Sequence, residues 1–252
     1  MTDSHLHIGQ YNNIYTSPDN LKKFLDCVGV DSFAVSSTTT CTKDYVKVMS
    51  EIKGIKELCG DRAIPVLWIL PQMFKNIDKS LGILMDSGIT WRCLKIHPQL
   101  HPDLWSKDNS PEMKWLIRIS RTLQCPILIH SGQMPGCDPS LFTNVFKKNW
   151  DRIFIIAHGR PLSETINIMK NCDNVWVDTA FMSTEDIVAL CKERLVDRIL
   201  WGTDYPIPKY FYPNCNMIDY YLNLVMELKK RTSESDFTKI TQTNFERLFS
   251  KI

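Results

Sequence analysis

Short hydrophobic runs alternate with longer amphipathic stretches along the whole chain. The hydrophobic runs predict strands at Asp3–Ile8, Ser32–Ser36, Ala63–Leu70, Arg92–His97, Pro126–His130, Ile153–His158, Val175–Asp178 and Ile199–Gly202. Between them, apolar residues at helical spacing predict helices, among them Pro18–Val28, Lys43–Leu58, Glu112–Leu123 and Thr184–Leu195. Strands that alternate with helices in this way are typical of parallel strands joined by helical crossovers. The pattern therefore predicts an α/β fold.

An open doubly wound sheet and a closed barrel both accommodate this alternation. An open sheet that bound a dinucleotide would carry a glycine-rich loop after its first strand, but here His7-Ile8-Gly9-Gln10-Tyr11-Asn12 follows. The repeated strand–helix units, the polar residues at strand ends and the length of 252 residues favour a (β/α)₈ TIM barrel. Since no linker or shift in composition divides the chain, we expect residues 1–252 to form a single domain. The last segment, Ser233–Ile252, predicts a C-terminal helical extension that packs on the barrel.

Composition and charge narrow the function classes. The formal net charge is +2, which argues against a dedicated nucleic-acid or membrane-surface binder. The nine cysteines contain no CxxC pair, so reduced thiols in a cytosolic protein are expected. No apolar run approaches the roughly 18 residues of a membrane helix, and the N-terminus shows no secretory signal. We therefore expect a cytoplasmic protein without nucleic-acid or membrane partners.

Polar residues that suit a metal ion gather at the predicted strand ends. His5 and His7 are two residues apart on the first strand, so both imidazoles point to one face. His130 and His158 end two further strands, and Asp204 follows the last one. A single histidine at such a place is more often a core or loop residue. The combination is more specific, because barrel enzymes place their active sites at the C-terminal ends of the strands.

Four imidazoles and a carboxylate on one rim suit a divalent ion, with Zn²⁺ preferred. Burying so many polar groups together without a cation would be costly. We therefore expect one divalent metal ion as the cofactor.

The set of motifs resembles the amidohydrolase superfamily, in particular its amidohydrolase-related branch of mononuclear hydrolases and related decarboxylases. The resemblance spans the chain, from the HxH on the first strand to the aspartate after the last. It implies that His5, His7, His130 and Asp204 are the metal ligands or contact the metal's water. It also implies a catalytic role for His158, or a ligand role if a second metal is bound. Asp204 is expected to accept the proton of the attacking water.

The fourth predicted strand allows two interpretations. Lys95 and His97 share one face of it by the period of two. In binuclear members of the superfamily a lysine here is carboxylated and bridges two metals, which would raise the number of ions to two. We favour an unmodified Lys95 that binds a substrate anion, with His97 beside it. TatD-type nucleases carry a glutamate at this strand, so Lys95 also argues against nuclease activity.

Further residues extend the predicted substrate site. Asp178 ends the seventh strand and either orients a ligand or the substrate, or caps the following turn or helix. Arg160 follows His158 and is a candidate for binding an anionic substrate. The aromatic-rich stretch 205–212 either forms a pocket wall or, as we favour, packs as a long loop on the barrel. His101 and Trp105 are candidates for a lid.

The function expected from these residues is hydrolysis of a C–N or C–O bond of a small molecule through a metal-activated water. One alternative is a metal-dependent decarboxylase of a small unsaturated or aromatic acid on the same scaffold. A further alternative is a catalytically silent barrel that retains the metal. Specificity lies in loops and pocket shape, so the substrate stays open. A homo-oligomer is compatible with the sequence.

Overall fold

The computed structural model describes residues 1–74, 80–100, 105 and 110–249. The described residues contain nine strands: β1 (Thr2–Tyr11), β2 (Ile14–Thr16), β3 (Ser32–Ser37), β4 (Ala63–Trp68), β5 (Cys93–Ile96), β6 (Ile127–His130), β7 (Phe154–Ala157), β8 (Val175–Asp178) and β9 (Ile199–Leu200). They form one curved sheet in the order β2-β1-β3-β4-β5-β6-β7-β8-β9. β2 pairs antiparallel with β1, and the other neighbours pair in parallel. The predicted α/β fold with a parallel sheet is confirmed.

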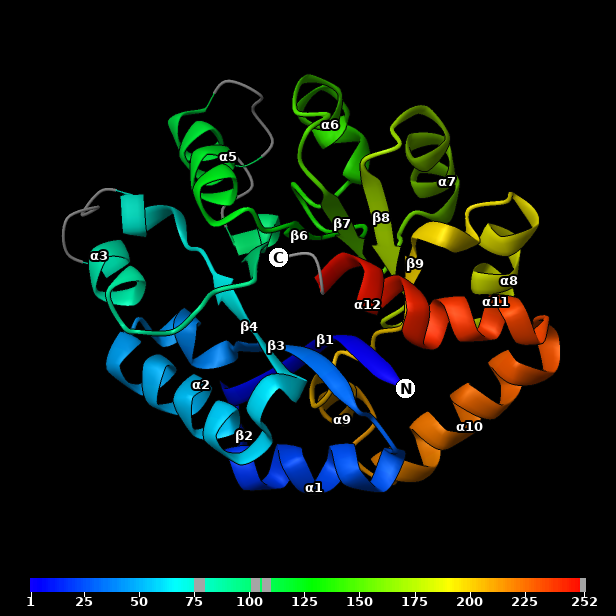
Figure 1. The fold of residues 1–252 in the computed structure, drawn as a ribbon, viewed down its shortest axis with the longest axis horizontal. Helices are drawn as coiled ribbons and strands as arrows, with labels where there is room; N and C mark the ends of the chain where they lie inside the picture. Colours follow the sequence, from blue (N-terminus) through cyan, green and yellow to red (C-terminus); the bar gives the residue numbers. More distant parts are fainter. Residues whose placement is uncertain (75–79, 101–104, 106–109, 250–252) are drawn as a thin grey trace.

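Helices accompany the sheet; most of them lie on its outer side, and α12 lies over it (Figure 1). They are α1 (Pro18–Val28), α2 (Tyr45–Cys59), α3 (Ser80–Met85), α5 (Pro111–Leu123), α6 (Thr143–Lys148), α7 (Leu162–Asn171), α8 (Thr184–Lys192), α9 (Ile207–Phe211), α10 (Met217–Arg231), α11 (Glu234–Thr238) and α12 (Asn244–Phe249). Two helices begin at the N-caps expected from the sequence. Ser17 precedes Pro18 at the start of α1 and accepts from the Asn20 amide, and Ser183 at the start of α8 accepts from the Asp186 amide. Within the described residues no helix has the length and apolarity to cross a bilayer.

The first strand also contacts the chain that follows the last one. Leu6 forms a parallel bridge with Tyr205, and the Ser4 amide donates to the Trp201 carbonyl at 2.8 Å. The Asp204 amide donates to the His5 carbonyl, also at 2.8 Å. These hydrogen bonds hold Asp204 beside the strand that carries His5.

The inner side of the sheet has an apolar layer below a polar one. On β5, Cys93 belongs to a buried cluster and Lys95 follows two residues later on the same face; on β8, Trp176 and Asp178 repeat this relation. The cluster contains buried residues of β3 through β9 and of α12. They are Ala34, Val66, Cys93, Leu128, Ile155, Ala157, Trp176, Leu200, Phe245, Leu248 and Phe249. Because strand residues two apart share a face, this packing fixes which residues line the opposite end.

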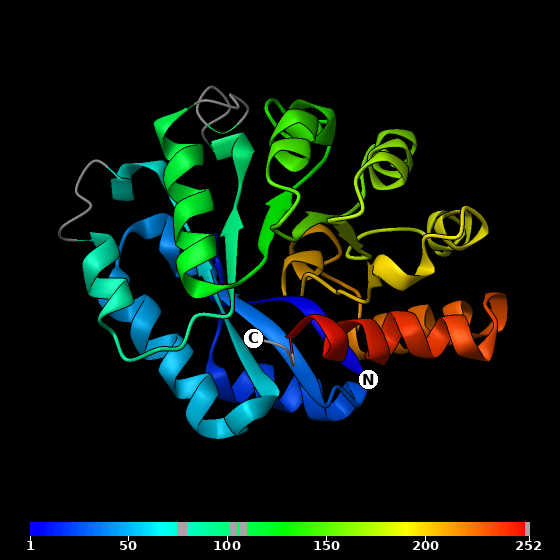
Figure 2. The same cartoon turned by 45° about the horizontal axis from the view of Figure 1, so that its top comes forward.

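The C-terminal segment forms the expected helical extension. Residues 233–249 fold as α11, a π-helical turn at Lys239–Thr243, and α12. The turned view shows α12 running inward over the sheet while α11 lies further out (Figure 2). The Trp201 amide donates to the Ile240 carbonyl at 3.0 Å, which ties this segment to the end of β9. The last three residues of the predicted extension lie outside the described residues.

The element bounds differ from the sequence expectation at a few places. The strand expected at Ile199–Gly202 is only two residues long, because the Gly202 amide donates to the Thr179 hydroxyl rather than continuing a strand ladder. The short antiparallel β2 was not predicted, because three residues carry no clear periodicity. His101, a candidate for the lid, lies outside the described residues, while Trp105 is fully buried.

Candidate metal centre

His5, His7 and Asp204 converge at one point of the inner side. Asp204 Oδ1 lies 3.3 Å from His5 Nε2 and 2.9 Å from His7 Nε2. The three side chains are buried, and their donor atoms all lie within 4.8 Å of one another. The structure thus brings together three of the predicted metal ligands.

Hydrogen bonds to the other ring nitrogens determine how the two imidazoles face. His5 Nδ1 lies 3.0 Å from Asp178 Oδ2, and His7 Nδ1 lies 2.9 Å from Ser36 Oγ. A carboxylate only accepts, so His5 carries its proton on Nδ1 and leaves the Nε2 lone pair free. Burial lowers the pKa of both imidazoles well below the usual value. Neutral imidazoles held by outer partners in this way are the form that binds a metal.

The Lys95 ammonium lies beside the same two imidazoles. Lys95 Nζ lies 2.6 Å from His5 Nε2 and 2.9 Å from His7 Nε2. Both imidazoles therefore accept from it, beside the Asp204 oxygen. Burial lowers the pKa of Lys95 to about 8, although Asp204 and Asp178 oppose the shift.

The donor set fits a divalent ion of the Zn²⁺ type, because two imidazole nitrogens and a carboxylate are its common ligands. A cation bound by the same lone pairs would displace the Lys95 ammonium from its present place. Lys95 lines the pocket as expected for a substrate-binding residue, but its direct partners here are the two histidines.

Asp178 contacts both the His5 ring and the turn that follows β8. Its Oδ2 accepts from His5, while its Oδ1 accepts from the His158 amide at 3.1 Å and the Ala180 amide at 3.0 Å. The same carboxylate therefore orients one imidazole and caps the turn after β8.

Asp3 is a site residue that the sequence analysis missed. Its Oδ1 accepts from the His5 amide at 3.0 Å, and its Oδ2 accepts from the Thr203 hydroxyl at 2.7 Å. Burial raises its pKa to about 7. Asp3, His5 and His7 alternate along β1, and that spacing was the signal that could have identified it.

His158 and His130 form a relay beside this group. His158 Nδ1 lies 3.0 Å from the Ala180 carbonyl, which only accepts, so the proton sits on Nδ1. Its Nε2 therefore accepts from His130 Nδ1 at 3.0 Å, and the His130 Nε2 lone pair stays free. Burial lowers the pKa of His158 to about 4 and that of His130 well below its usual value.

The ring of His130 stacks on His97, with centroids 3.7 Å apart and an interplanar angle of 16°. The donor atoms of His130, His97 and Cys137 lie within 4.8 Å of one another. The structure thus groups His130 with these two residues rather than with His5, His7 and Asp204. Its role as a metal ligand stays a prediction. Cys137 carried no sequence signal, since it lies in a loop without a motif.

A cavity of about 520 Å³ opens above these groups. Arg160 borders it, and its guanidinium lies 5.9 Å from the Phe181 ring centre. The aromatic stretch after Asp204 contributes Phe211 and Tyr212 to its lining, which is the alternative that the sequence interpretation did not favour. Trp68 was missed, because a tryptophan in an apolar strand gives no sign of facing a site; its ring lies 4.9 Å from Lys95 Nζ.

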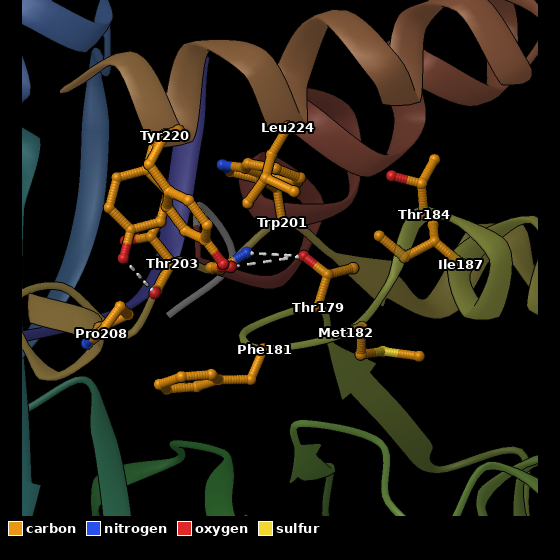
Figure 3. A pocket seen from close by; sticks show the side chains of 12 residues that line it. Thr179, Phe181, Met182, Thr184, Ile187, Trp201, Thr203, Pro208, Tyr220 and Leu224 are labelled. Carbon is orange, nitrogen blue, oxygen red and sulfur yellow. Dashed lines mark hydrogen bonds between the residues drawn. The ribbon is translucent and has the colours of Figure 1, made fainter. Parts of the chain in front are cut away.

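A second, much smaller cavity of about 10 Å³ lies behind the segment that carries Asp204 (Figure 3). There the Tyr221 hydroxyl donates to the Thr203 carbonyl at 2.8 Å, and the Gly202 amide donates to Thr179 Oγ1 at 3.1 Å. Phe181 borders both cavities. These contacts hold the backbone just before Asp204 from the side opposite the site.

The sequence of the chain is similar to one family of known proteins. A family model described as amidohydrolase matches residues 94–250. A search of curated proteins found no match.

Similar folds occur among solved structures of low sequence identity. A probable 2-pyrone-4,6-dicarboxylic acid hydrolase from Acinetobacter baumannii has a TM-score of 0.67 at 11% identity, covering 99% of this chain and 98% of that one. 4-Oxalomesaconate hydratase from Rhodopseudomonas palustris has a TM-score of 0.65 at 13% identity, covering 99% and 95%. IDCase from Metarhizium anisopliae has a TM-score of 0.68 at 14% identity, covering 99% and 96%.

Proposed function

The chain belongs to the amidohydrolase family, and on that premise we propose that it is a metal-dependent hydrolase that cleaves a C–N or C–O bond of a small carboxylate-bearing molecule. One observation carries the proposal: two neutral imidazoles and a buried carboxylate direct their lone pairs to one point at the floor of a cavity. Lone pairs that converge in this way attract a cation; the Lys95 ammonium occupies that place in this structure, and a bound metal ion would displace it.

His5, His7 and Asp204 would hold the cation, with Asp178 and Ser36 fixing the two imidazoles from behind. When bound, a divalent ion of this kind supplies Lewis acidity, which polarises a substrate carbonyl and lowers the pKa of a coordinated water. Zn²⁺ is the ion that this donor set favours.

The residues around the cation would accept the proton of the attacking water. Asp204 has one carboxylate oxygen at the two histidines and reaches the cavity, so it can take the proton of the attacking water. His158 is neutral at neutral pH, since burial lowers its pKa to about 4. The lone pair of its Nε2 already accepts from His130 Nδ1, so this pair of histidines would take up a proton at the free His130 Nε2.

The shape and charge of the cavity indicate the substrate class. A volume of about 520 Å³ suits a small molecule. Arg160 at the wall offers a planar donor group that matches a carboxylate. Two of the similar structures are named for acids, a pyrone dicarboxylic acid and oxalomesaconate. A small cyclic or unsaturated carboxylic acid derivative is therefore the substrate class that we propose.

A decarboxylase is the second candidate, and the same pocket favours it. Arg160 and Lys95 would bind the carboxylate that leaves, and a neutral His158 stands beside them. A hydrolase consumes water and releases an acid or an amine, whereas a decarboxylase releases CO₂. The product distinguishes them.

The contacts between the first strand and the chain after the last one concern the closure of the sheet. The bridge between Leu6 and Tyr205 and the hydrogen bonds of Ser4 and Asp204 connect β1 to the chain after β9. We infer from them that the parallel strands close into a (β/α)₈ barrel and that residues 1–252 form one domain.

Metal content measured together with activity tests the proposal. We expect gently purified protein to contain about one zinc-like ion per chain by elemental mass spectrometry. Chelation should abolish turnover of lactones, lactams and carboxylic acids screened for water uptake and CO₂ release, and added Zn²⁺ should restore it. Asp204→Asn should be inactive with unchanged circular dichroism, while Asp219→Asn on the exposed side of α10 should stay active.

Turnover that survives complete metal removal, or an active Asp204→Asn variant, would contradict the proposal. Metal bound at full occupancy without turnover of any screened compound would favour a catalytically silent barrel instead.

A further inference from the structure

We propose that Tyr221 of α10 is a positioning residue for Asp204, which it holds in place through the peptide group that joins Thr203 to Asp204. The Tyr221 hydroxyl donates to the Thr203 carbonyl at 2.8 Å. Tyr221 borders the small cavity behind Asp204 rather than the large one, so it acts through the backbone and not on a substrate (Figure 3). This role rests on the proposed function, in which Asp204 holds the cation and takes up the proton of the attacking water.

The peptide group between Thr203 and Asp204 is held at both ends. Its carbonyl oxygen accepts from Tyr221, and its N–H donates to the His5 carbonyl at 2.8 Å. Because the peptide group is planar, hydrogen bonds at its two opposite ends fix its rotation about the chain direction. The φ of Asp204, which is 55°, depends on that rotation and sets the direction in which the side chain leaves the backbone.

The backbone conformation of Asp204 needs this support. A residue other than glycine adopts the left-handed region only where its surroundings hold it there. The Asp204 carboxylate lies 2.9 Å from His7 Nε2 and 3.3 Å from His5 Nε2. A rotation of the preceding peptide group would therefore move the carboxylate away from the point where the two imidazoles meet.

The residue after Asp204 is anchored as well. The Tyr205 ring stacks on Phe24 of α1, with centroids 3.7 Å apart and an interplanar angle of 4°. Phe24 in turn meets the Tyr221 ring edge to face, at 5.4 Å and 73°. The segment that carries Asp204 is thus attached to α10 on one side and to α1 on the other.

The Tyr221 hydroxyl remains a donor under all working conditions. Its side chain is buried, and burial, together with the nearby Asp204 and Asp3 carboxylates, raises the pKa of Tyr221 well above its usual value. Thr203 is buried too, so its carbonyl would lose a hydrogen bond in a place that is closed to bulk water if the hydroxyl were removed.

Tyr221→Phe tests the role of this hydrogen bond, because it removes the hydroxyl and keeps the ring. We expect the affinity for Zn²⁺ to fall about 10-fold, as measured by competition with a chelating dye. We also expect the visible absorption bands of the Co²⁺-loaded variant to differ from those of the wild-type chain, since these bands depend on the geometry of the ligands around the ion.

Two control variants on the same helix separate positioning from a general loss of stability. Tyr220→Phe removes a hydroxyl that has no hydrogen-bond partner among the described residues, on a ring beside the same small cavity, and should keep the wild-type affinity and bands. Leu228→Ala truncates a fully buried side chain of α10. It should lower the urea midpoint at least as far as Tyr221→Phe and leave the cobalt bands unchanged.

A Tyr221→Phe variant with the wild-type affinity and the wild-type bands would overturn the role of Tyr221 and leave the proposed function intact. A spectral change in Leu228→Ala as large as that in Tyr221→Phe would overturn it too, because the effect would then follow stability alone. A wild-type chain that binds neither Zn²⁺ nor Co²⁺ would reject both the role of Tyr221 and the proposed function.

Discussion

At the scale of single residues, the site depends on side chains that each satisfy several partners. The Asp178 carboxylate accepts three N–H groups, one from the His5 ring and two from the backbone of His158 and Ala180. No uncharged residue of the same shape has as many acceptor positions. The orientation of His5 and the turn after β8 therefore depend on the same group.

Asp178→Asn is expected to lower the affinity for the cation by about 10–100-fold. The amide has one acceptor oxygen, so whichever way it turns, its NH₂ group faces an N–H donor and either His5 or the turn loses its partner. Competition with a chelating dye measures the affinity. Asp173→Asn, fully exposed after α7, is the matched control, and equal affinities of the two variants would contradict the role given to Asp178.

Two residues of the site have backbones in the left-handed region. His158 has a φ of 67° and Asp204 a φ of 55°. Such conformations cost about 1–3 kcal/mol and persist where the surroundings hold them. The His158 amide donates to the Asp178 carboxylate, and the Asp204 amide donates to the His5 carbonyl. These hydrogen bonds stabilise the two backbone conformations.

At the scale of elements, β1 shows how closely the strands and helices must fit. Gly9 near its end has a φ of +92°, and a Cβ there would lie 2.4 Å from Thr39 Oγ1 and 2.6 Å from Glu51 Oε2. Glu51 on α2 is buried and accepts from the hydroxyls of Ser37 and Thr39. Only a glycine, which has no Cβ, allows the backbone of β1 to lie this close to the side chains of Glu51 and Thr39.

Gly9→Ala is expected to destabilise the protein more than Gly29→Ala does. Both glycines have positive φ, so an alanine costs about 1–2 kcal/mol of backbone strain at either place. Gly29 has open space around it, whereas overpacking at Gly9 adds about 1–3 kcal/mol. Urea unfolding measures the difference, and equal midpoints would show that the Glu51 group moves aside without cost.

At the scale of the whole molecule, the C-terminal helix closes one end of the sheet and leaves the other for chemistry. Phe245, Leu248 and Phe249 of α12 pack on residues from β3 through β9. In Figure 1, α12 lies over the curved sheet. The apolar layer that α12 completes supports the polar layer of histidines and acids two residues further along the strands.

Phe245→Ala is expected to lower the free energy of unfolding by about 3–5 kcal/mol, since it leaves a cavity against several strands at once. Trp150→Ala is the control, because that aromatic side chain is 78% exposed and should cost under about 0.5 kcal/mol. Denaturant unfolding of both variants measures the effect. A loss at Phe245 no larger than at Trp150 would mean that α12 packs only loosely on the sheet.

Much of this arrangement could be predicted from the chain. The period of two placed His5 and His7 on one face and, independently, Lys95 with His97, and the structure has both pairs on the inner side. The cap at Ser17 fixed the start of α1 at Pro18. These predictions are local: strand alternation and helix capping depend on residues a few positions apart.

Contacts between distant segments could not be predicted in this way. The hydrogen bond from His5 to Asp178 spans 173 residues, and that from Thr203 to Asp3 spans 200. The stacking of His130 on His97 with Cys137 nearby depends on how a loop folds back onto two strands. None of these pairings has a periodicity or a motif, because each is set by the packing of complete elements.

The sequence by itself determined the order of strands and helices, the faces of the strands and the residue types gathered at their ends. Alternation and capping are short-range effects, so they are visible along the chain. Only the tertiary structure decided which side chains lie together: His5 and His7 with Asp204, and His130 with His97. Curvature of the sheet sets those distances, and it results from the packing of all the strands and helices together.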